Sequence, residues 1–297
     1  MGGIMGISES QLETWSNQGA VVSAEATHKS VRAALDSFAW PEGVKFDAYL
    51  QGSYRNSTNI RGNSDVDLVV ELTSVAYSNL TEEQSRQLRL IDAKYTWSAF
   101  RQHVVKALVD YYGSRLVDTS GSKSLKVLPD SGRLMADVVV GARYNFYADL
   151  NIAASGFTFW TLPGNVQVIN YPKLHYDNGV DKNSKERTRG WFKPTIRTFK
   201  NARDTILEKK PALSGQFPSY FLECLFFNVP DERFGGTSRD NYADTINWLN
   251  EKLATPEAEK FVCQNWRYYL FGDLIVQWKV DRARQLVREL ISLWNEW

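Results

Sequence analysis

The chain has 297 residues, which is enough for one bilobed domain or for two closely packed domains, and we expect two lobes. Its 35 lysine and arginine residues nearly balance its 34 aspartate and glutamate residues, so no overall charge excess indicates binding to nucleic acid or to a membrane surface. The two cysteines and three histidines give neither a disulfide framework nor the ligand spacing of a zinc site. The sequence shows no secretory signal pattern and no apolar run long enough to span a bilayer, so we expect a cytoplasmic protein.

The first part of the chain begins with a helical pattern and continues with two strand-like stretches. The helical pattern covers about residues 8–38 and ends at Trp40 and Pro41, where proline disfavours continuation. The stretches VKFDAYL (44–50) and DVDLVVEL (65–72) are rich in residues that favour strands. The polar, glycine-containing sequence between them predicts a loop or a short helix.

A further helix and further strands are predicted in the following hundred or so residues. Residues 81–112 have helical periodicity, Thr81 and Gln84 have the spacing of a capping box, and Gly113 follows. The sequences KSLKVL and RLMADVVVGARY, together with the short stretch 167–170, favour strands. This mixture of helices and strands predicts an α+β fold for the first lobe.

The second part of the chain reads as almost wholly helical from about residue 181. Helical periodicity is found in the sequences PTIRTFKNARDTILEK, PSYFLECLFFNV, NYADTINWLNEKL and VDRARQLVRELISLW. The change in pattern places a lobe boundary between Tyr171 and Arg189. We therefore predict a mixed lobe over residues 1–180 and a helical lobe over residues 181–297.

Two aspartates, Asp65 and Asp67, lie in the second strand-like stretch among apolar residues. Alternate residues of a strand share one face, so the two carboxylates point the same way while Val66 and Leu68 point into the core. Like charges this close repel each other, and such a pair persists most readily with a divalent cation between them. For the sequence DVD alone, the commoner explanation is a solvated strand edge or a turn in which aspartates cap backbone amides.

The surrounding sequence favours the cation. Gly52 and Ser53 follow a predicted strand, and a glycine-serine turn there can bind phosphate through close backbone approach and hydroxyl donation. A third aspartate, Asp137, lies among apolar residues of another predicted strand, where an unpaired carboxylate is costly. Asp65, Asp67 and Asp137 on adjacent strands would hold two Mg²⁺ ions, for which Mn²⁺ can substitute, as nucleotidyl transfer requires.

These motifs resemble those of the polymerase-β-like nucleotidyltransferase superfamily. More narrowly, the chain resembles the bacterial cGAS-like enzymes (CD-NTases) of antiphage signalling systems, in the clade that contains cyclic UMP-AMP synthases. The resemblance covers about residues 49–230 and is carried by the sequences QGSYRNSTNIRGNSDVDLVV, MADVVV, YPKLHYDNGVDKN, FKPTIRTFKNARD and FPSYFLECLFFNVP. It implies a mixed-sheet catalytic lobe, a helical second lobe and an N-terminal helix that braces both.

The resemblance also implies nucleotide contacts in the helical lobe. Lys200 matches a lysine that contacts the triphosphate, although a surface ion pair with Asp204 explains its spacing equally well. Ser219 matches a phosphate-contacting serine at a helix N-terminus, although simple capping is an equal alternative. Tyr220 matches an aromatic residue on which a base stacks.

Three further residues near these positions are interpreted as structural. Glu223 is expected to pair with a basic neighbour, and Cys224 to pack as a small apolar group. His175 is expected to make a local hydrogen bond in a loop and not to act as a general base.

Asn178 is the candidate for base selection. A side-chain amide offers both donor and acceptor, so it can match the pairing edge of uracil, and the resembling clade associates an asparagine in this segment with pyrimidine use. Asn183 is the competing position. The alternative is that Asn178 and Gly179 form only a turn, because Asn-Gly is a strong turn dipeptide.

The sequence therefore predicts an enzyme that makes a cyclic dinucleotide second messenger from NTPs, using UTP and most simply ATP, to give cyclic UMP-AMP or a related pyrimidine-containing product. The alternatives are a linear nucleotidyltransferase acting on RNA, protein or a small molecule, and a catalytically silent nucleotide-binding regulator. We expect no DNA activator, because the residues for a zinc-bearing DNA-binding insertion are missing. We also expect a monomer that does not associate with a membrane. The product is expected to act on a separate effector protein.

Overall fold

The computed structural model describes residues 6–19, 21–61, 65–91, 93–130, 132–274 and 276–297. They form two compact units. We call the first the sheet unit, which comprises the described residues of Ala20–Tyr54 and Ser64–Pro172. The second is the helical unit, which comprises the described residues of Met1–Gly19, Arg55–Asn63 and Lys173–Trp297. The sheet unit thus ends earlier than the predicted lobe boundary at residue 180, and the first described residues belong with the helical unit.

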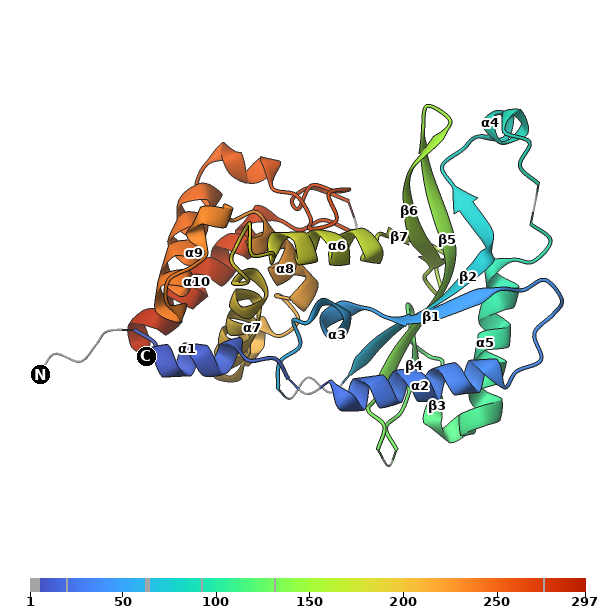
Figure 1. The fold of residues 1–297 in the computed structure, drawn as a ribbon, viewed down its shortest axis with the longest axis horizontal. Helices are drawn as coiled ribbons and strands as arrows, with labels where there is room; N and C mark the ends of the chain where they lie inside the picture. The colour runs from blue at the N-terminus through green and yellow to red at the C-terminus, as the bar shows by residue number, and fades with distance from the viewer. Residues whose placement is uncertain (1–5, 20, 62–64, 92, 131, 275) are drawn as a thin grey trace, which may run out of the picture. The chain divides into compact units, whose positions relative to one another are not determined.

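The sheet unit is built around one mixed sheet. In the described chain it has seven strands in the order β1-β2-β5-β4-β3, with β6 paired to β5 and β7 paired to β6 (Figure 1). Only β2 and β5 run parallel to each other; the other pairs are antiparallel. The strands are β1 Phe46–Leu50, β2 Val66–Ser78, β3 Val117–Asp118, β4 Leu125–Val127, β5 Ala136–Ala148, β6 Asn151–Trp160 and β7 Gln167–Asn170.

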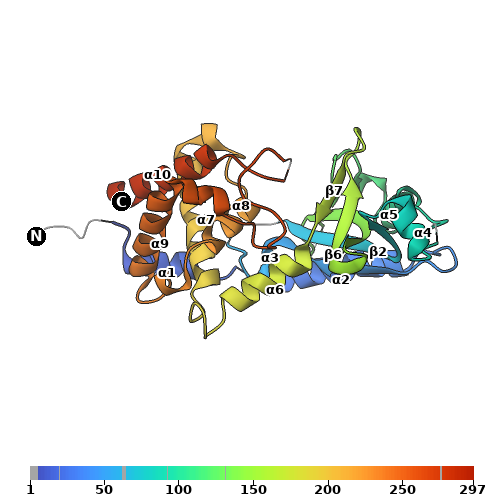
Figure 2. The ribbon, with the colours of Figure 1, turned by 90° about the horizontal axis from the view of Figure 1, so that it is seen from above.

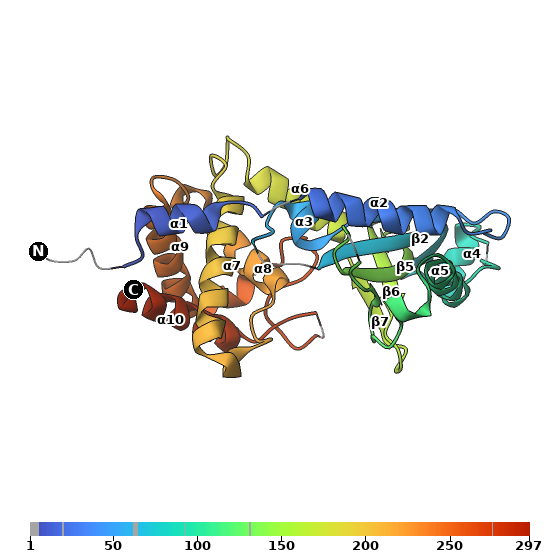
Figure 3. The ribbon, with the colours of Figure 1, turned by 90° about the horizontal axis from the view of Figure 1, so that it is seen from below.

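Two helices, α2 Val22–Asp36 and α5 Trp97–Tyr112, pack against one face of this sheet and against each other (Figures 1 and 3). Val66, Leu68 and Val138 are fully buried in the core that these helices cover, so the prediction of which β2 side chains enter the core is confirmed. Their neighbours along the strands therefore lie on the opposite face.

Two predicted helices differ from those observed. The helical pattern over 8–38 is divided into α1 Glu9–Ser16 and α2. The single helix predicted over 81–112 is divided into α4 Glu82–Gln87 and α5, because Arg89 adopts the left-handed conformation at φ 54°. The predicted capping box of Thr81 and Gln84 is present at the start of α4.

Strand β6 was not predicted, because its sequence does not show the usual strand alternation. Its Gly156 lies against β7, where a Cβ would come within 2.7 Å of the Asn170 carbonyl oxygen and 2.8 Å of the Tyr171 ring. The glycine that weakens the strand pattern is therefore required by close packing.

The helical unit contains the predicted helices of the second half of the chain. They are α7 Phe192–Lys209, α8 Ser219–Phe227, α9 Ser238–Leu253 and α10 Val280–Glu296. Helices α9 and α10 lie side by side (Figure 2), and α1 packs against α7 and α9. Phe199 of α7 stacks on Phe226 of α8 with ring centroids 4.1 Å apart. In the described chain, no helix is both long and apolar enough to cross a membrane.

Two helices lie at the boundary of the units along the chain. Helix α3, Gly52–Asn56, follows β1 and spans the position where the chain passes from one unit to the other. Helix α6, Pro172–Lys182, occupies the segment that was predicted as a connection between lobes. The α+β class is confirmed.

Candidate functional site

The glycine-serine turn holds one aspartate closely in the sheet unit. Gly52 adopts a left-handed conformation at φ 62°, and a Cβ there would overlap Asp67 Oδ2. The backbone N–H of Gln51 donates to the carbonyl oxygen of Asp67 at 2.9 Å. Ser53 follows within α3 and is buried. Only glycine fits this turn, because any other side chain would displace the carboxylate.

A row of three charged residues crosses the sheet at the level of Asp67. In the parallel pair of β2 and β5, Asp67 is directly in register with Asp137. In the antiparallel pair of β4 and β5, Lys126 is in register with the same Asp137. Residues at one register level share a face, so the two carboxylates and the ammonium lie on the face away from α2 and α5.

Asp137 occupies an environment that disfavours its charge. Its Oδ1 is buried and has no hydrogen-bond partner among the described residues. Burial raises the pKa of Asp137, the charge of Asp65 raises that pKa further, and Lys126 lowers it. A carboxylate in this position would be stabilised by an additional cation.

Asp65 directly precedes β2, and its negative charge raises the pKa of Asp137. Burial raises the pKa of Tyr54, and the charges of Asp65 and Asp67 raise it further. In the described part of the chain, no group of three His, Cys, Asp or Glu side chains is gathered tightly enough to hold a metal ion as it stands. The carboxylate ligands, the unsatisfied Asp137 Oδ1 and the glycine turn nevertheless fit a hard divalent cation.

The predicted phosphate contact of the helical unit, Ser219, is the first residue of α8. Its Oγ accepts a hydrogen bond of 3.2 Å from the guanidinium of Arg203, which also donates to the Phe217 carbonyl at 3.1 Å. Arg203 is buried on α7. A helix N-terminus beside a fixed guanidinium is a suitable place for an anion.

Lys200 has other partners than expected. Its side chain is fully buried, and Nζ donates to Glu223 Oε1 at 2.6 Å and to Thr58 Oγ1 at 3.0 Å. The alternative of a surface pair with Asp204 is wrong, since Asp204 pairs with Arg203 at 2.7 Å. A triphosphate contact by Lys200 remains a prediction, and it would require the ammonium to leave this pair.

Glu223 is the centre of a buried network, which confirms that it pairs with a basic neighbour. Oε1 accepts hydrogen bonds from Lys200 and from Thr58 Oγ1, the latter at 2.6 Å. Oε2 accepts from Asn56 Nδ2 at 3.1 Å and pairs with His175 Nε2 at 2.8 Å. Burial alone would raise the pKa of Glu223, but the Lys200 ammonium and the His175 hydrogen bond outweigh it and lower that pKa below its usual range.

Tyr220 lies beside His175 in the helical unit. The two rings are stacked, with centroids 5.0 Å apart and an interplanar angle of 28°. The Tyr220 hydroxyl accepts a hydrogen bond of 3.3 Å from Asn265, and the residue is 40% exposed. His175 lies in α6 and not in a loop, because residues 172–182 form a helix. Cys224 is buried in the apolar core, as expected.

Asn178 lies inside α6, so the predicted alternative of a turn is wrong. Its Nδ2 donates to the Gln264 carbonyl at 2.7 Å, and the following Gly179 lies so close to Gln264 that a Cβ would overlap the Gln264 amide. This close contact explains a glycine inside a helix. The competing Asn183 uses its Oδ1 to accept the backbone N–H of Lys193 at 2.8 Å.

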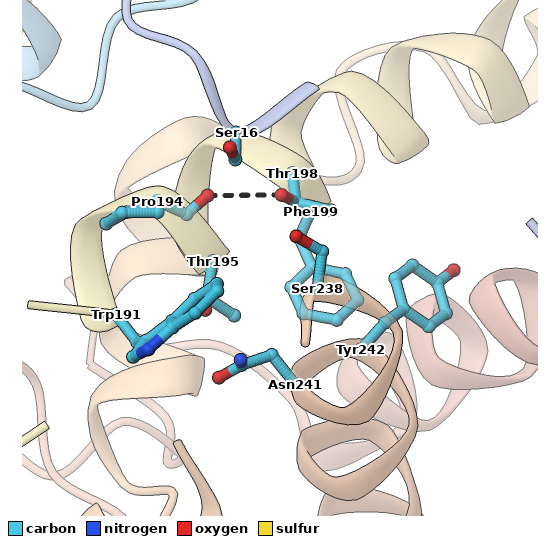
Figure 4. Close-up of a pocket in the computed structure, with 9 residues that line it drawn as sticks. All are labelled: Ser16, Trp191, Pro194, Thr195, Thr198, Phe199, Ser238, Asn241 and Tyr242. Atoms are coloured by element: carbon cyan, nitrogen blue, oxygen red, sulfur yellow. Dashed lines mark hydrogen bonds between the residues drawn. The ribbon is translucent and has the colours of Figure 1, made fainter. Parts of the chain in front are cut away.

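Two hollows in the helical unit are separate from these residues. The one in Figure 4 has a volume of about 10 Å³ and lies between Trp191, Thr195 and Asn241, with room for a single water. The other has a volume of about 330 Å³, and its described lining, which includes Arg187 and Trp266, contains none of the predicted nucleotide contacts.

Sequence reasoning missed two polar residues near the predicted site. Lys126 alternates with the buried Leu125 and Val127, so the strand pattern alone places it on the polar face. Arg203 lies in a predicted helix, and nothing in the sequence indicates its contact with Ser219.

Comparison with known proteins assigns the chain to a family. Residues 31–119 match the nucleotidyltransferase domain, and residues 177–295 match the C-terminal helical domain of cGAS/DncV-like nucleotidyltransferases. The cyclic UMP-AMP synthase of Rhodothermus marinus is 48% identical over 297 residues, which cover 99% of both chains. The chain belongs to the cGAS/DncV-like nucleotidyltransferases.

Other relatives of this nucleotidyltransferase agree with that assignment. The cyclic nucleotide synthase CdnE01 of Staphylococcus haemolyticus is 34% identical, with 99% of this chain and 100% of the relative covered. The structure of the Rhodothermus marinus synthase with Apcpp and Upnpp superimposes with a TM-score of 0.90, with 98% of this chain and 97% of that chain covered. Nucleotidyltransferases with this catalytic domain typically use divalent metal ions.

Proposed function

We propose that this nucleotidyltransferase joins ATP and UTP into a cyclic dinucleotide, with cyclic UMP-AMP as the product. The chain is a cyclic nucleotide synthase by its similarity over full length to the Rhodothermus marinus enzyme. The observation that carries the site assignment is the register of Asp67 with Asp137 beside the Gly52 turn. The choice of ATP and UTP is supported by the name of that relative and by its structure with Apcpp and Upnpp.

Asp65, Asp67 and Asp137 are the residues that would hold two Mg²⁺ ions, or Mn²⁺ in their place. Bound there, the ions would favour deprotonation of the attacking hydroxyl and neutralise charge on the departing pyrophosphate. Gly52 allows the backbone of the turn to approach a phosphate, and Ser53 supplies a hydroxyl donor. Asp137, whose Oδ1 is buried without a hydrogen-bond partner among the described residues, would accept the proton of the attacking hydroxyl.

In the helical unit, Ser219 and the amides of the first turn of α8 would bind phosphate oxygens, with Arg203 holding the Ser219 hydroxyl in place. Tyr220 would stack on one base through its exposed ring surface. Lys200 would contact the triphosphate only if its ammonium left Glu223. We therefore expect Lys200 to contribute less to nucleotide binding than Ser219 and Tyr220.

We propose further that the enzyme works in the cytoplasm as a monomer, without a DNA activator, and that its product acts on a separate effector protein. The near balance of acidic and basic residues supports a small-molecule substrate over a nucleic-acid track.

The test is incubation of the pure protein with labelled ATP, UTP and Mg²⁺, followed by phosphatase treatment. We expect a phosphatase-resistant product that contains both nucleotides, since a closed ring has no terminal phosphate. Label that phosphatase releases completely would indicate a linear transferase, and an absence of any product in all NTP mixtures would indicate a silent nucleotide-binding regulator. Either result contradicts the proposal.

Asn178 gives a second test, concerning base choice. With Nδ2 given to Gln264, its Oδ1 would accept the N3–H of uracil. Asn178→Ser is therefore expected to lower the UTP-to-ATP incorporation ratio about fivefold, since losing a hydrogen bond costs about 1 kcal/mol. The ratio is measured in an equimolar mixture of four NTPs, with Asn183→Ser as the matched control. An unchanged ratio in a folded Asn178→Ser variant would mean that Asn178 does not select the base and serves only to hold Gln264.

A further inference from the structure

The stacked pair of His175 and Tyr220 differs from an ordinary core contact in its exposure. His175 is only 5% exposed, whereas Tyr220 beside it is 40% exposed as a residue. The rings are 5.0 Å apart at an interplanar angle of 28°. The buried histidine ring therefore packs against a tyrosine that is partly exposed.

His175 is itself held by a rigid anchor. Its Nε2 lies 2.8 Å from Glu223 Oε2, and because the lowered pKa of Glu223 keeps that carboxylate ionised, Nε2–H is the donor. Glu223 is 3% exposed and is fixed by Lys200 and by Asn56 and Thr58. With one ring nitrogen bound to such a carboxylate, the imidazole plane has little freedom to turn.

The Tyr220 ring is restrained at its other parts as well. Asn265 donates to its hydroxyl at 3.3 Å, and the Trp278 ring lies 5.8 Å away at an interplanar angle of 38°. The orientation of the Tyr220 ring is thus restrained by the hydrogen bond from Asn265 and by the rings of Trp278 and His175. Of these two rings, His175 is the stacked one.

We infer that His175 is a positioning residue for nucleotide binding: its ring, oriented by Glu223, fixes the plane of Tyr220 so that the open part of the tyrosine is ready to stack on a base. This inference rests on the proposed role of Tyr220. A platform that is already oriented loses less side-chain entropy on binding, so His175 contributes to affinity for the stacked nucleotide and not to the chemical step.

A second histidine-tyrosine pair in the sheet unit provides a control. Tyr95 and His103 are stacked at 5.8 Å and 19°, and their hydroxyl and Nδ1 are joined directly at 2.6 Å. This pair belongs to none of the predicted nucleotide contacts. Loss of its histidine reports the effect of breaking a stacked pair on the general stability of the protein.

The test uses two variants that separate the ring from the hydrogen bond. His175→Phe keeps an aromatic ring against Tyr220 and loses the bond to Glu223, whereas His175→Gln keeps a donor for Glu223 and loses the ring. KM and kcat are measured for ATP at saturating UTP and for UTP at saturating ATP, with Tyr220→Ala and His103→Ala alongside, and thermal unfolding is followed for every variant.

We expect His175→Gln to raise KM by about three- to tenfold for the nucleotide that also responds to Tyr220→Ala, with little change in kcat, because the cost of ordering one free side chain on binding is of that order. His175→Phe should raise the same KM by less, even where it lowers the melting temperature more. His103→Ala should leave both KM values unchanged.

The opposite order, with KM closer to the wild type in His175→Gln than in His175→Phe, would overturn the inference, since only the bond to Glu223 would then matter. Unchanged KM values in both His175 variants, with a raised KM in Tyr220→Ala, would also overturn it and leave the stacking role of Tyr220 intact. Unchanged KM values in Tyr220→Ala would instead remove the proposed stacking role on which the inference rests.

Discussion

Replacing Asp67 and Asp137 together with asparagine is expected to lower the rate of cyclic dinucleotide formation by about a thousandfold or more while the protein stays folded. The two residues are in direct register on β2 and β5, and Asp137 Oδ1 has no hydrogen-bond partner in the described chain. Asparagine keeps the side-chain volume and removes both charges, so divalent cations lose ligands that supply several kcal/mol of transition-state stabilisation. The rate is measured with labelled ATP and UTP, and folding by thermal unfolding.

Asp47→Asn is the matched control for the double variant. Asp47 lies on β1 of the same sheet and is mostly exposed, and its Oδ1 accepts the backbone N–H of Ala48 at 2.8 Å and pairs with Arg32 at 3.6 Å. It should retain wild-type activity. Wild-type turnover in a well-folded Asp67→Asn, Asp137→Asn protein would mean that these carboxylates are not metal ligands.

Gly52→Ala is the second substitution with a large expected effect, and it should reduce activity about a hundredfold. The added Cβ would overlap Asp67 Oδ2, so the carboxylate must move away from its position in register with Asp137. A displacement of about 1 Å in a catalytic group can cost about a hundredfold in rate. The left-handed backbone of Gly52, at φ 62°, adds about 1 kcal/mol of destabilisation.

Gly43→Ala is the control that separates the effect of backbone strain from the effect of displacing the Asp67 carboxylate. Gly43 also has a left-handed backbone, at φ 81°, and no described atom lies within 4 Å of the position that its Cβ would take. This variant should show the same small loss of stability and full activity. Equal activity losses in the Gly43 and Gly52 variants would attribute the effect to backbone strain and not to Asp67.

The face of the sheet that carries the aspartates could be predicted, because strand alternation in DVDLVV and MADVVV sends Val66, Leu68 and Val138 to the core that α2 and α5 cover. The register of Asp67 with Asp137 could not be derived in this way. It depends on the pairing of β2 with β5, strands far apart in the sequence, and local patterns carry no information about which strands pair.

The predictions for the helical unit were less complete, because they depend on contacts between distant segments. Helical periodicity located α7, but the full burial of Lys200 follows from a carboxylate on the next helix and from Thr58. Likewise, Asn178 and Gly179 have a turn sequence, and their place in a helix follows from packing against Gln264. Tertiary packing overrode local preference at both positions.

Binding of Mn²⁺ tests the central claim about the site most directly, because it does not depend on turnover. The free Mn²⁺ signal in electron paramagnetic resonance is followed during titration into the wild type, the Asp67→Asn, Asp137→Asn variant and the Asp47→Asn control, each with a non-hydrolysable ATP analogue. A titration into the analogue alone is subtracted, because the analogue binds Mn²⁺ by itself. We predict saturable binding in the wild type and in the control, and binding at least about tenfold weaker in the double variant. Equal Mn²⁺ affinity in all three proteins would contradict the assignment of Asp67 and Asp137 as metal ligands.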